Sequence, residues 1–392
     1  VDLRKGPAYD TNPTKYSADM ASIKVGENGI ALLHNYRDRI GQLNANAVFG
    51  GSSGIFNINA LKADLGNSST LAYTNAGGLA TNTLQNVIFT NVGNDVTFAY
   101  SANNGSINVN NTYLTDFLIN PNGVTVGQNT VPFVAENGFI TNNVTDATVG
   151  ATGIAGLVMN TKVGLQSFSK NNTPVGAVYA KTKTLNNGTI TMTGRPTDGA
   201  VAMYTKYGKV ENSVSGKVNI EDDNSIGLYG IDSSQVLNTG TVNVKGNSSL
   251  GLYGVSDDLL NPTVTGASGV LLRQDATGII NVEGTDSAGI YGTKVRTVAG
   301  KTYIIENNGT INVNNGDSLG IYSDNVNVTT VGNINLNDIS VNTAGNRVGV
   351  YAQGTDATVT TTGANINLGT KDQTNIAYYV TNNAKLSGAN LE

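Results

Sequence analysis

One histidine and a few acidic clusters are the side chains of this sequence that could carry acid–base chemistry. His34 is the single histidine among 392 residues, and there is no cysteine. A serine–histidine–aspartate triad needs an imidazole beside the nucleophile, and a catalytic zinc ion usually has three protein ligands rich in histidine or cysteine. We therefore expect no such catalytic site, no metal and no cofactor. His34 is interpreted as a surface or cap residue.

Carboxylates could support a different reaction, because glycoside hydrolysis uses two of them about 5 to 9.5 Å apart across a groove. The candidates are Glu221, Asp222 and Asp223 in one cluster and Asp257 and Asp258 in another. Neither cluster has the ligand spacing of an EF-hand calcium loop. When the repeats described below are aligned, the residue before a recurrent serine varies among short polar types: Asn224, Ser248, Asp286 and Asp317. Such variation is typical of a turn, so we expect turn residues rather than catalysts.

Tyrosines recur at the end of a Gly-aliphatic-Tyr triplet. They are Tyr229, Tyr253, Tyr291, Tyr322 and Tyr351, and a degraded copy ends at Tyr378. Exposed tyrosines can bind proteins or sugars with little loss of entropy, whereas stacked aromatic rings can also fix the register of strands. We favour the structural ladder. Gly-rich stretches such as 150–156 lack the spacing of a nucleotide-binding loop and are interpreted as repeat turns.

The elements that position these tyrosines are short strands in a sequence repeat. Successive triplets lie 24 to 38 residues apart, and the longest interval contains "GASGVLLRQ" (266–274), interpreted as a copy without its tyrosine. The repeat is then roughly 25 residues, in the range of solenoid proteins. A second phrase, Gly-Thr-aliphatic-Asn-aliphatic, occurs at 240–244, 278–282 and 309–313.

Both phrases alternate with a period of two, which is the mark of a strand with one buried face. Ile311 and Val313 should point inward, while Thr310 and Asn312 point outward. In "SLGIY" (318–322) the same rule puts Leu319 and Ile321 on one face and Ser318, Gly320 and Tyr322 on the other.

Two or three short strands per repeat predict an all-β fold, a right-handed parallel β-helix whose strands stack about 4.8 Å apart. The predicted interior ladder is Leu228, Leu252, Ile290, Ile321 and Val350. An array of β-sandwich domains is the alternative, but it needs units of about 100 residues joined by antiparallel hairpins.

The repeat divides the chain into segments of unequal regularity. We expect an N-terminal segment at 1–48, irregular coils with insertions at 49–184 and regular coils at 185–390. Weaker copies such as "SSGIF" (52–56) support one continuous solenoid. Apolar residues at helical spacing from Ile30 to Leu43 predict a helix or cap, although "ENGIALL" in the same region also resembles the repeat.

Composition excludes several function classes. The net charge is −5, charged residues make up 13%, and no basic run is present, which argues against nucleic-acid binding. No apolar stretch is long enough for a membrane-spanning helix. The first ten residues lack the apolar core of a signal peptide, and Leu391 and Glu392 are typical of a cloning scar. We interpret the chain as a piece of a longer protein.

The phrases "NNGTINVNNGDSLGIY" and "NTGTVNVKGNSSLGLYG" resemble the passenger repeats of large type V autotransporter adhesins, especially the fusobacterial outer-membrane group. The resemblance is good over 185–379 and patchy before that. It implies an extracellular β-helix at the cell surface, anchored in the outer membrane by a β-barrel outside this sequence. It also implies a virulence-related partner, a protein or glycan receptor on host cells or other bacteria.

We therefore expect a non-enzymatic adhesin passenger that mediates cell–cell attachment. The alternatives are a carbohydrate-active β-helix enzyme and a passive stalk that displays other domains. Irregular segments escape the constraint of stacking, and loops on a rigid scaffold often carry binding residues. The predicted binding surface consists of aromatic residues from such segments: Tyr73, Tyr100, Tyr113, Phe117, Phe133 and Phe168.

Overall fold

The computed structural model is all-β, and the residues that it describes contain strands and turns but no helix. The described residues are 14–19, 22–35, 54–59, 62–75, 81–85, 87–102, 105–110, 118–119, 129–144, 157–159, 161–169, 182–194, 199–232, 234–256, 271–295, 303–337, 345–369 and 374–388.

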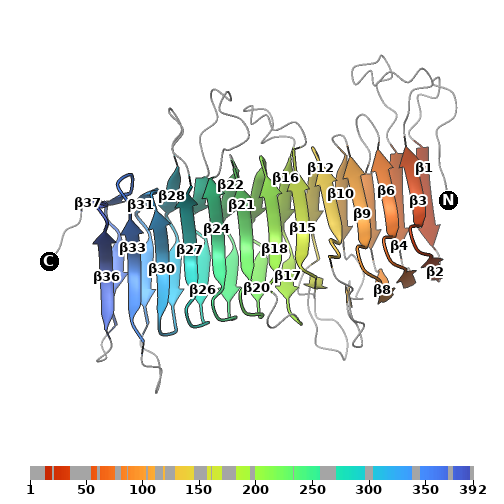
Figure 1. Ribbon diagram of the computed structural model, residues 1–392. Coiled ribbons are helices and arrows are strands. Elements are labelled where there is room, and N and C mark those ends of the chain that lie inside the picture. Colours follow the sequence, from red (N-terminus) through yellow and green to blue (C-terminus); the bar gives the residue numbers. More distant parts are fainter. Residues whose placement is uncertain are drawn as a thin grey trace, which may run out of the picture. The chain divides into compact units, whose positions relative to one another are not determined.

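The chain divides into two compact units, and each contains parallel strands that recur in threes along the sequence (Figure 1). Unit 1 comprises residues 1–171 and 181–191, and unit 2 comprises 172–180 and 192–392. With one break in unit 1, every third strand joins the same sheet, so three strands make one coil and successive coils stack. The prediction of a parallel β-helix is confirmed.

Unit 1 has four groups of hydrogen-bonded strands. The first is β1 (Thr14–Asp19), β4 (Gly54–Asn59), β7 (Thr81–Gln85), β10 (Ser106–Asn110), β13 (Phe139–Asn142) and β16 (Lys183–Asn186). The second is β3 (Ile30–Asn35), β6 (Thr70–Asn75), β9 (Thr97–Ala102), β12 (Phe133–Glu136) and β15 (Val163–Phe168). The third is β2 (Ser22–Val25), β5 (Lys62–Leu65) and β8 (Ile88–Val92), and the fourth is β11 (Leu118–Ile119), β14 (Leu157–Met159) and β17 (Thr189–Met192).

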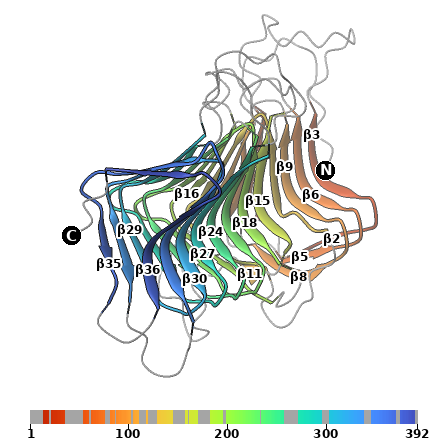
Figure 2. The ribbon, with the colours of Figure 1, turned by 60° about the vertical axis from the view of Figure 1, so that its left-hand side comes forward.

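Unit 2 has three sheets, which Figure 2 shows as rows of neighbouring strands. Sheet A is β18 (Val201–Lys206), β21 (Ile226–Ile231), β24 (Leu250–Ser256), β27 (Ala288–Lys294), β30 (Ser318–Asp324), β33 (Arg347–Gln353) and β36 (Asn375–Thr381). Sheet B is β19 (Lys209–Asn212), β22 (Gln235–Asn238), β25 (Leu271–Gln274), β28 (Ile304–Asn307), β31 (Asn327–Thr330), β34 (Thr358–Thr361) and β37 (Lys385–Ser387). Sheet C is β20 (Lys217–Ile220), β23 (Thr241–Val244), β26 (Ile279–Val282), β29 (Thr310–Val313), β32 (Asn333–Leu336) and β35 (Asn365–Asn367).

Aliphatic side chains of the three sheets fill the interior of unit 2. The five predicted interior residues are completely buried and lie in register: Leu228, Leu252, Ile290, Ile321 and Val350. On sheet C, Ile311 and Val313 are buried, while Thr310 and Asn312 face outward and are half-buried. The alternation predicted for this strand is confirmed.

The alternation predicted for Ser318–Asp324 is wrong on one side of Gly320. Ser318 is buried, and Leu319 faces outward together with Tyr322. The pairing with the next coil passes over the glycine, from Leu319 to Ile321, so the strand bends at this residue. A Cβ on Gly320 would lie 2.6 Å from the carbonyl oxygen of Gly349 and 2.8 Å from the side chain of Ile334. The first residue of the triplet is therefore glycine, because at this bend a side chain would collide with the backbone of the next coil and with the core.

The residues before the recurrent serine adopt the left-handed conformation that a tight turn requires. Their φ angles are 53° to 54° at Asn224, Ser248, Asp286 and Asp317. Asparagine and aspartate tolerate this conformation better than most residues, which explains the short polar types at this position. The interpretation of these residues as turn residues is confirmed.

Three readings of the N-terminal region and the long repeat interval are corrected by the strand pairing. Ile30–Asn35 is strand β3 in register with β6 rather than the start of a helix, and the later part of the expected helix lies outside the described residues. "SSGIF" falls partly on β4, a strand of the first group rather than of the group that carries tyrosines. Leu271–Gln274 belongs to sheet B, so 266–274 is no lost tyrosine copy, and the interval from Tyr253 to Tyr291 is one long coil.

Ile321→Asp tests the buried ladder. We expect the free energy of unfolding to fall by about 4 kcal/mol, because a carboxylate without a partner would replace a fully buried side chain. The control is Thr310→Asp, at an outward position of the same coil, which should change stability by less than about 1 kcal/mol. Urea unfolding followed by circular dichroism measures both, and equal effects would contradict the assignment of the two faces.

Candidate functional site

Seven tyrosines form a continuous column on the outer side of sheet A. Ring centroids of neighbours lie 4.3 to 5.3 Å apart. Four of the six contacts are parallel stacks, and two are edge-to-face: Tyr204 with Tyr229, and Tyr253 with Tyr291. The members are Tyr204, Tyr229, Tyr253, Tyr291, Tyr322, Tyr351 and Tyr379.

Five of these residues belong to the predicted ladder, and two were missed by sequence reasoning. Tyr204 follows Ala-Met instead of Gly-aliphatic, so its triplet does not match. At the last coil, Tyr379 pairs with Tyr351, while Tyr378 pairs with the interior residue Val350. The assignment of Tyr378 to the degraded copy was therefore wrong by one position.

Stacking determines which part of each ring a partner could touch. A tyrosine between two parallel neighbours has both ring faces covered, and only its edge and hydroxyl group are open. Tyr322 is such a residue, with interplanar angles of 17° to Tyr291 and 11° to Tyr351. The column therefore offers few free ring faces, and its geometry agrees with a structural role in fixing strand register.

Burial changes the acidity of the column. Desolvation, with a smaller contribution from nearby tyrosines, raises the pKa of Tyr253 to about 12. Desolvation, followed by the charges of Tyr229 and Asp232, raises the pKa of Tyr204 to about 12. Burial also raises the pKa of Tyr229, Tyr291 and Tyr322. These five tyrosines are thus neutral at physiological pH.

The predicted binding residues of unit 1 fall into three different environments. Tyr73 and Tyr100 are half-buried and stack at 5.2 Å in register, as the column of unit 2 does. The hydroxyl of Tyr100 donates to the Glu136 carboxylate at 2.8 Å, and burial and this bond raise the pKa of Tyr100. Phe168 is half-buried at the end of β15. Tyr113 and Phe117 lie outside the described residues.

The prediction that Phe133 belongs to a binding surface is wrong. Phe133 is fully buried and pairs in register with Ala99 and Leu165, which are also fully buried. Its ring meets Phe98 edge to face at 6.0 Å, and Phe98 in turn stacks on Phe89 at 3.7 Å. This aromatic core of unit 1 was not recognised from the sequence, because aromatic residues in an irregular segment resemble interface residues.

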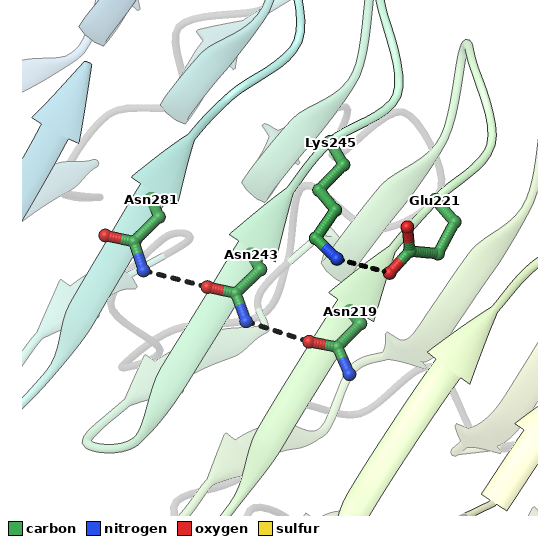
Figure 3. A network of polar contacts seen from close by, with 5 residues as sticks. All are labelled: Asn219, Glu221, Asn243, Lys245 and Asn281. Atoms are coloured by element: carbon green, nitrogen blue, oxygen red, sulfur yellow. Dashed lines mark hydrogen bonds and ion pairs between the residues drawn. The ribbon is translucent and has the colours of Figure 1, made fainter. Parts of the chain in front are cut away.

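A column of asparagines runs along the outer side of sheet C. Asn243 donates to Asn219, and Asn281 donates to Asn243, each at 2.8 Å (Figure 3). The chain continues through Asn312 and Asn335 with two further bonds of 2.8 Å. Each interior member donates one amide hydrogen to one neighbour and accepts one from the other. We call this set the outer asparagine ladder.

A second amide column lies inside, where each sheet B strand ends. Asn212 donates to Asn238 at 2.8 Å, and Asn238 donates to Gln274 at 3.2 Å. All three side chains are fully buried. A third column links coils through serine: the backbone N–H of Ser225 donates to the hydroxyl of Ser249, and that of Ser249 donates to Ser287. These bonds satisfy polar groups that the core could not otherwise tolerate.

The acidic cluster is occupied by contacts between coils. Glu221 pairs with Lys245 at 2.9 Å (Figure 3). Asp222 accepts from the backbone N–H of Gly194 at 3.0 Å, and Asp223 accepts from that of Asn247 at 2.7 Å. Asp257 and Asp258 lie outside the described residues. His34 belongs to strand β3, in register with Thr74.

Within the described ranges, no three histidine, cysteine or acidic side chains are grouped so that they could hold a metal ion. The same part of the chain has no helix that is long and apolar enough to cross a membrane.

Replacing one amide in each column should separate their contributions to stability. Asn238→Ala leaves buried partners unsatisfied, so we expect a loss of about 2 to 4 kcal/mol of unfolding free energy. Asn281→Ala should cost about 1 kcal/mol, because water can replace its bonds at a half-buried site. Denaturant unfolding measures the difference, and a larger loss for Asn281→Ala would contradict this ranking.

The raised tyrosine pKa values predict sensitivity to alkali. An unfolded tyrosine loses its proton near pH 10, whereas folded Tyr253 holds it to about pH 12. This contribution to the free energy of unfolding should be fully present below pH 10 and should be lost as the pH rises from 10 towards 12. Between these values the tyrosine hydroxyl ionises only in the unfolded state. Urea midpoints measured at several pH values should decline less for Tyr253→Phe than for the wild type. An identical decline would show that Tyr253 does not contribute.

Comparisons with family models, with curated proteins and with solved structures found no match to this chain.

Proposed function

We propose that the chain is a non-enzymatic, surface-exposed passenger region of a bacterial autotransporter adhesin, which attaches cells through a protein or glycan receptor. The proposal combines the resemblance of its repeats to such passengers with one observation. In unit 2 the coils are tied to one another by hydrogen-bonded side-chain columns as well as by backbone pairing. A rigid scaffold of this kind suits a protein that must hold a binding site away from a cell surface.

The contacts of the acidic residues also support an adhesin over a carbohydrate-active enzyme. Glu221, Asp222 and Asp223 each bind a group of a neighbouring coil, as a stacking contact requires. A hydrolase would need a carboxylate pair open towards a substrate groove.

The receptor site remains a prediction for the irregular coils of unit 1. Phe133 leaves the set of candidates because it is buried, and Tyr73 and Tyr100 form a stacked pair of the ladder type. Phe168, half-buried at the end of β15, stays a candidate, as do Tyr113 and Phe117, which lie outside the described residues. We propose that they contribute to the receptor contact.

Binding of the fluorescently labelled full chain to bacterial and epithelial cells tests the proposal. We expect saturable binding that an excess of unlabelled chain displaces. The double variant Tyr113→Ala and Phe117→Ala should weaken binding at least tenfold, whereas Val214→Ala, at an exposed position of unit 2, should not. Absence of saturable binding to every cell type would favour a passive stalk. Release of reducing ends from a glycan panel would favour the enzyme.

A further inference from the structure

The three outer faces of unit 2 differ sharply in chemistry. Outward residues of sheet C are mainly threonine and asparagine, as in Thr241 and Asn243 or Thr310 and Asn312. Outward residues of sheet B include ion-paired side chains, such as Arg273 and Glu306. Sheet A presents the tyrosine column between two further rows of side chains. We call this surface the tyrosine face.

One row beside the tyrosines is aliphatic in every coil. In the coils that carry the glycine, its bend shifts the preceding residue towards the outer side, as described for Leu319. The members of this row are Val201, Ile226, Leu250, Ala288, Leu319, Val348 and Ile376. Ala288 and Val348 are buried, and the other five are half-buried. The row on the other side is Lys206, Ile231, Val255, Thr293, Asp324, Gln353 and Thr381. Lys206 and Asp324 are the charged residues of these two rows, and the Lys206 amine lies 3.4 Å from the Asp232 carboxylate.

We propose that the tyrosine face is a self-association surface on which a second copy of this chain packs, face to face and related by a two-fold axis. The partner must present apolar ridges at the spacing of the coils, because the face repeats one tyrosine and one aliphatic residue per coil. A second copy of the chain has the same spacing, because its coils are the same. Each copy brings little charge to the contact, because the Lys206 amine is paired with the Asp232 carboxylate of its own chain and Asp324 is the other charged residue of the two rows.

The size of the face agrees with a weak dimer. Seven coils at about 4.8 Å give a length of about 34 Å, and five residue steps at about 3.3 Å give a width of about 17 Å. Each copy would thus contribute about 570 Å², or roughly 1,100 Å² for the pair, just above the roughly 1,000 Å² of specific interfaces. The ring edges and hydroxyl groups that stacking leaves open would lie at the centre of the contact. We expect micromolar affinity.

Sedimentation velocity of the full chain over a concentration series tests this inference, which does not rest on the proposed receptor function. The wild type should shift from monomer to dimer as concentration rises. The double variant Leu250→Glu and Leu319→Glu should remain monomeric, because four carboxylates would be buried in the contact. The matched control is Thr241→Glu and Thr310→Glu, which makes the same charge change on sheet C of the same two coils and should still dimerise.

A second measurement uses the absence of natural cysteine. Single cysteines at Val255, Thr293 and Gln353 sample the tyrosine face, and Thr310→Cys samples sheet C. On oxidation, at least one of the three should give disulfide-linked dimers faster than Thr310→Cys. A wild type that stays monomeric throughout would overturn the inference. So would dimerisation that the Leu250 and Leu319 changes leave intact, or cross-linking that is fastest at Thr310.

Discussion

In-register stacking of one coil on the next is the constraint on which the rest of this structure depends. Parallel strands about 4.8 Å apart place each residue directly over its equivalent in the neighbouring coil. Leu228 lies over Leu252, and Tyr229 lies over Tyr253. A side chain is therefore acceptable at a given position only if it packs against, or hydrogen-bonds with, a similar one above and below. This requirement explains why the sequence repeats short phrases and why the phrases differ little.

Stacking also determines how the polar residues are used. An amide fits a ladder because it can donate to one neighbour and accept from the other, as Asn243 does between Asn219 and Asn281. Buried amides such as Asn238 satisfy their groups in the same way without water. Acidic residues that resemble catalytic groups in the sequence, such as Asp223, accept hydrogen bonds from the backbone of the next coil. The scaffold thus uses its polar side chains to hold coils together.

Features that repeat in every coil could be predicted from the sequence, and features that break the repeat could not. The period-two pattern identified the buried ladder through Ile290 and Ile321, and the varying residue before serine identified the left-handed turn at Asp286. The outward position of Leu319 was missed because a bend at glycine shifts the alternation by one residue. Tyr204 was missed because its coil has alanine in place of that glycine.

Unit 1 shows why the candidate site was harder to predict. In unit 1, Leu71 and Phe98 stand immediately before Ala72 and Ala99, which pair in register. Both are large, fully buried side chains at the position that glycine holds in unit 2. The triplet therefore cannot be recognised from the sequence. Tyr73 and Tyr100 nevertheless lie on the same kind of column. Phe133 resembles an exposed anchor in the sequence, but its register with Ala99 places it in the core. Register between distant strands is a tertiary property, and a single sequence does not show it.

Zero-length carbodiimide cross-linking of the folded chain, followed by mass spectrometry, tests the coil stacking most directly. The stacked coils place the Lys245 amine 2.9 Å from the Glu221 carboxylate and the Lys24 amine 3.3 Å from the Asp64 carboxylate, and the reagent can reach both carboxylates. We predict amide links between Lys245 and Glu221 and between Lys24 and Asp64. Both links should disappear in urea. Absence of these links from the folded chain, with Lys245 joined instead to carboxylates that stacking places far away, would contradict the parallel β-helix.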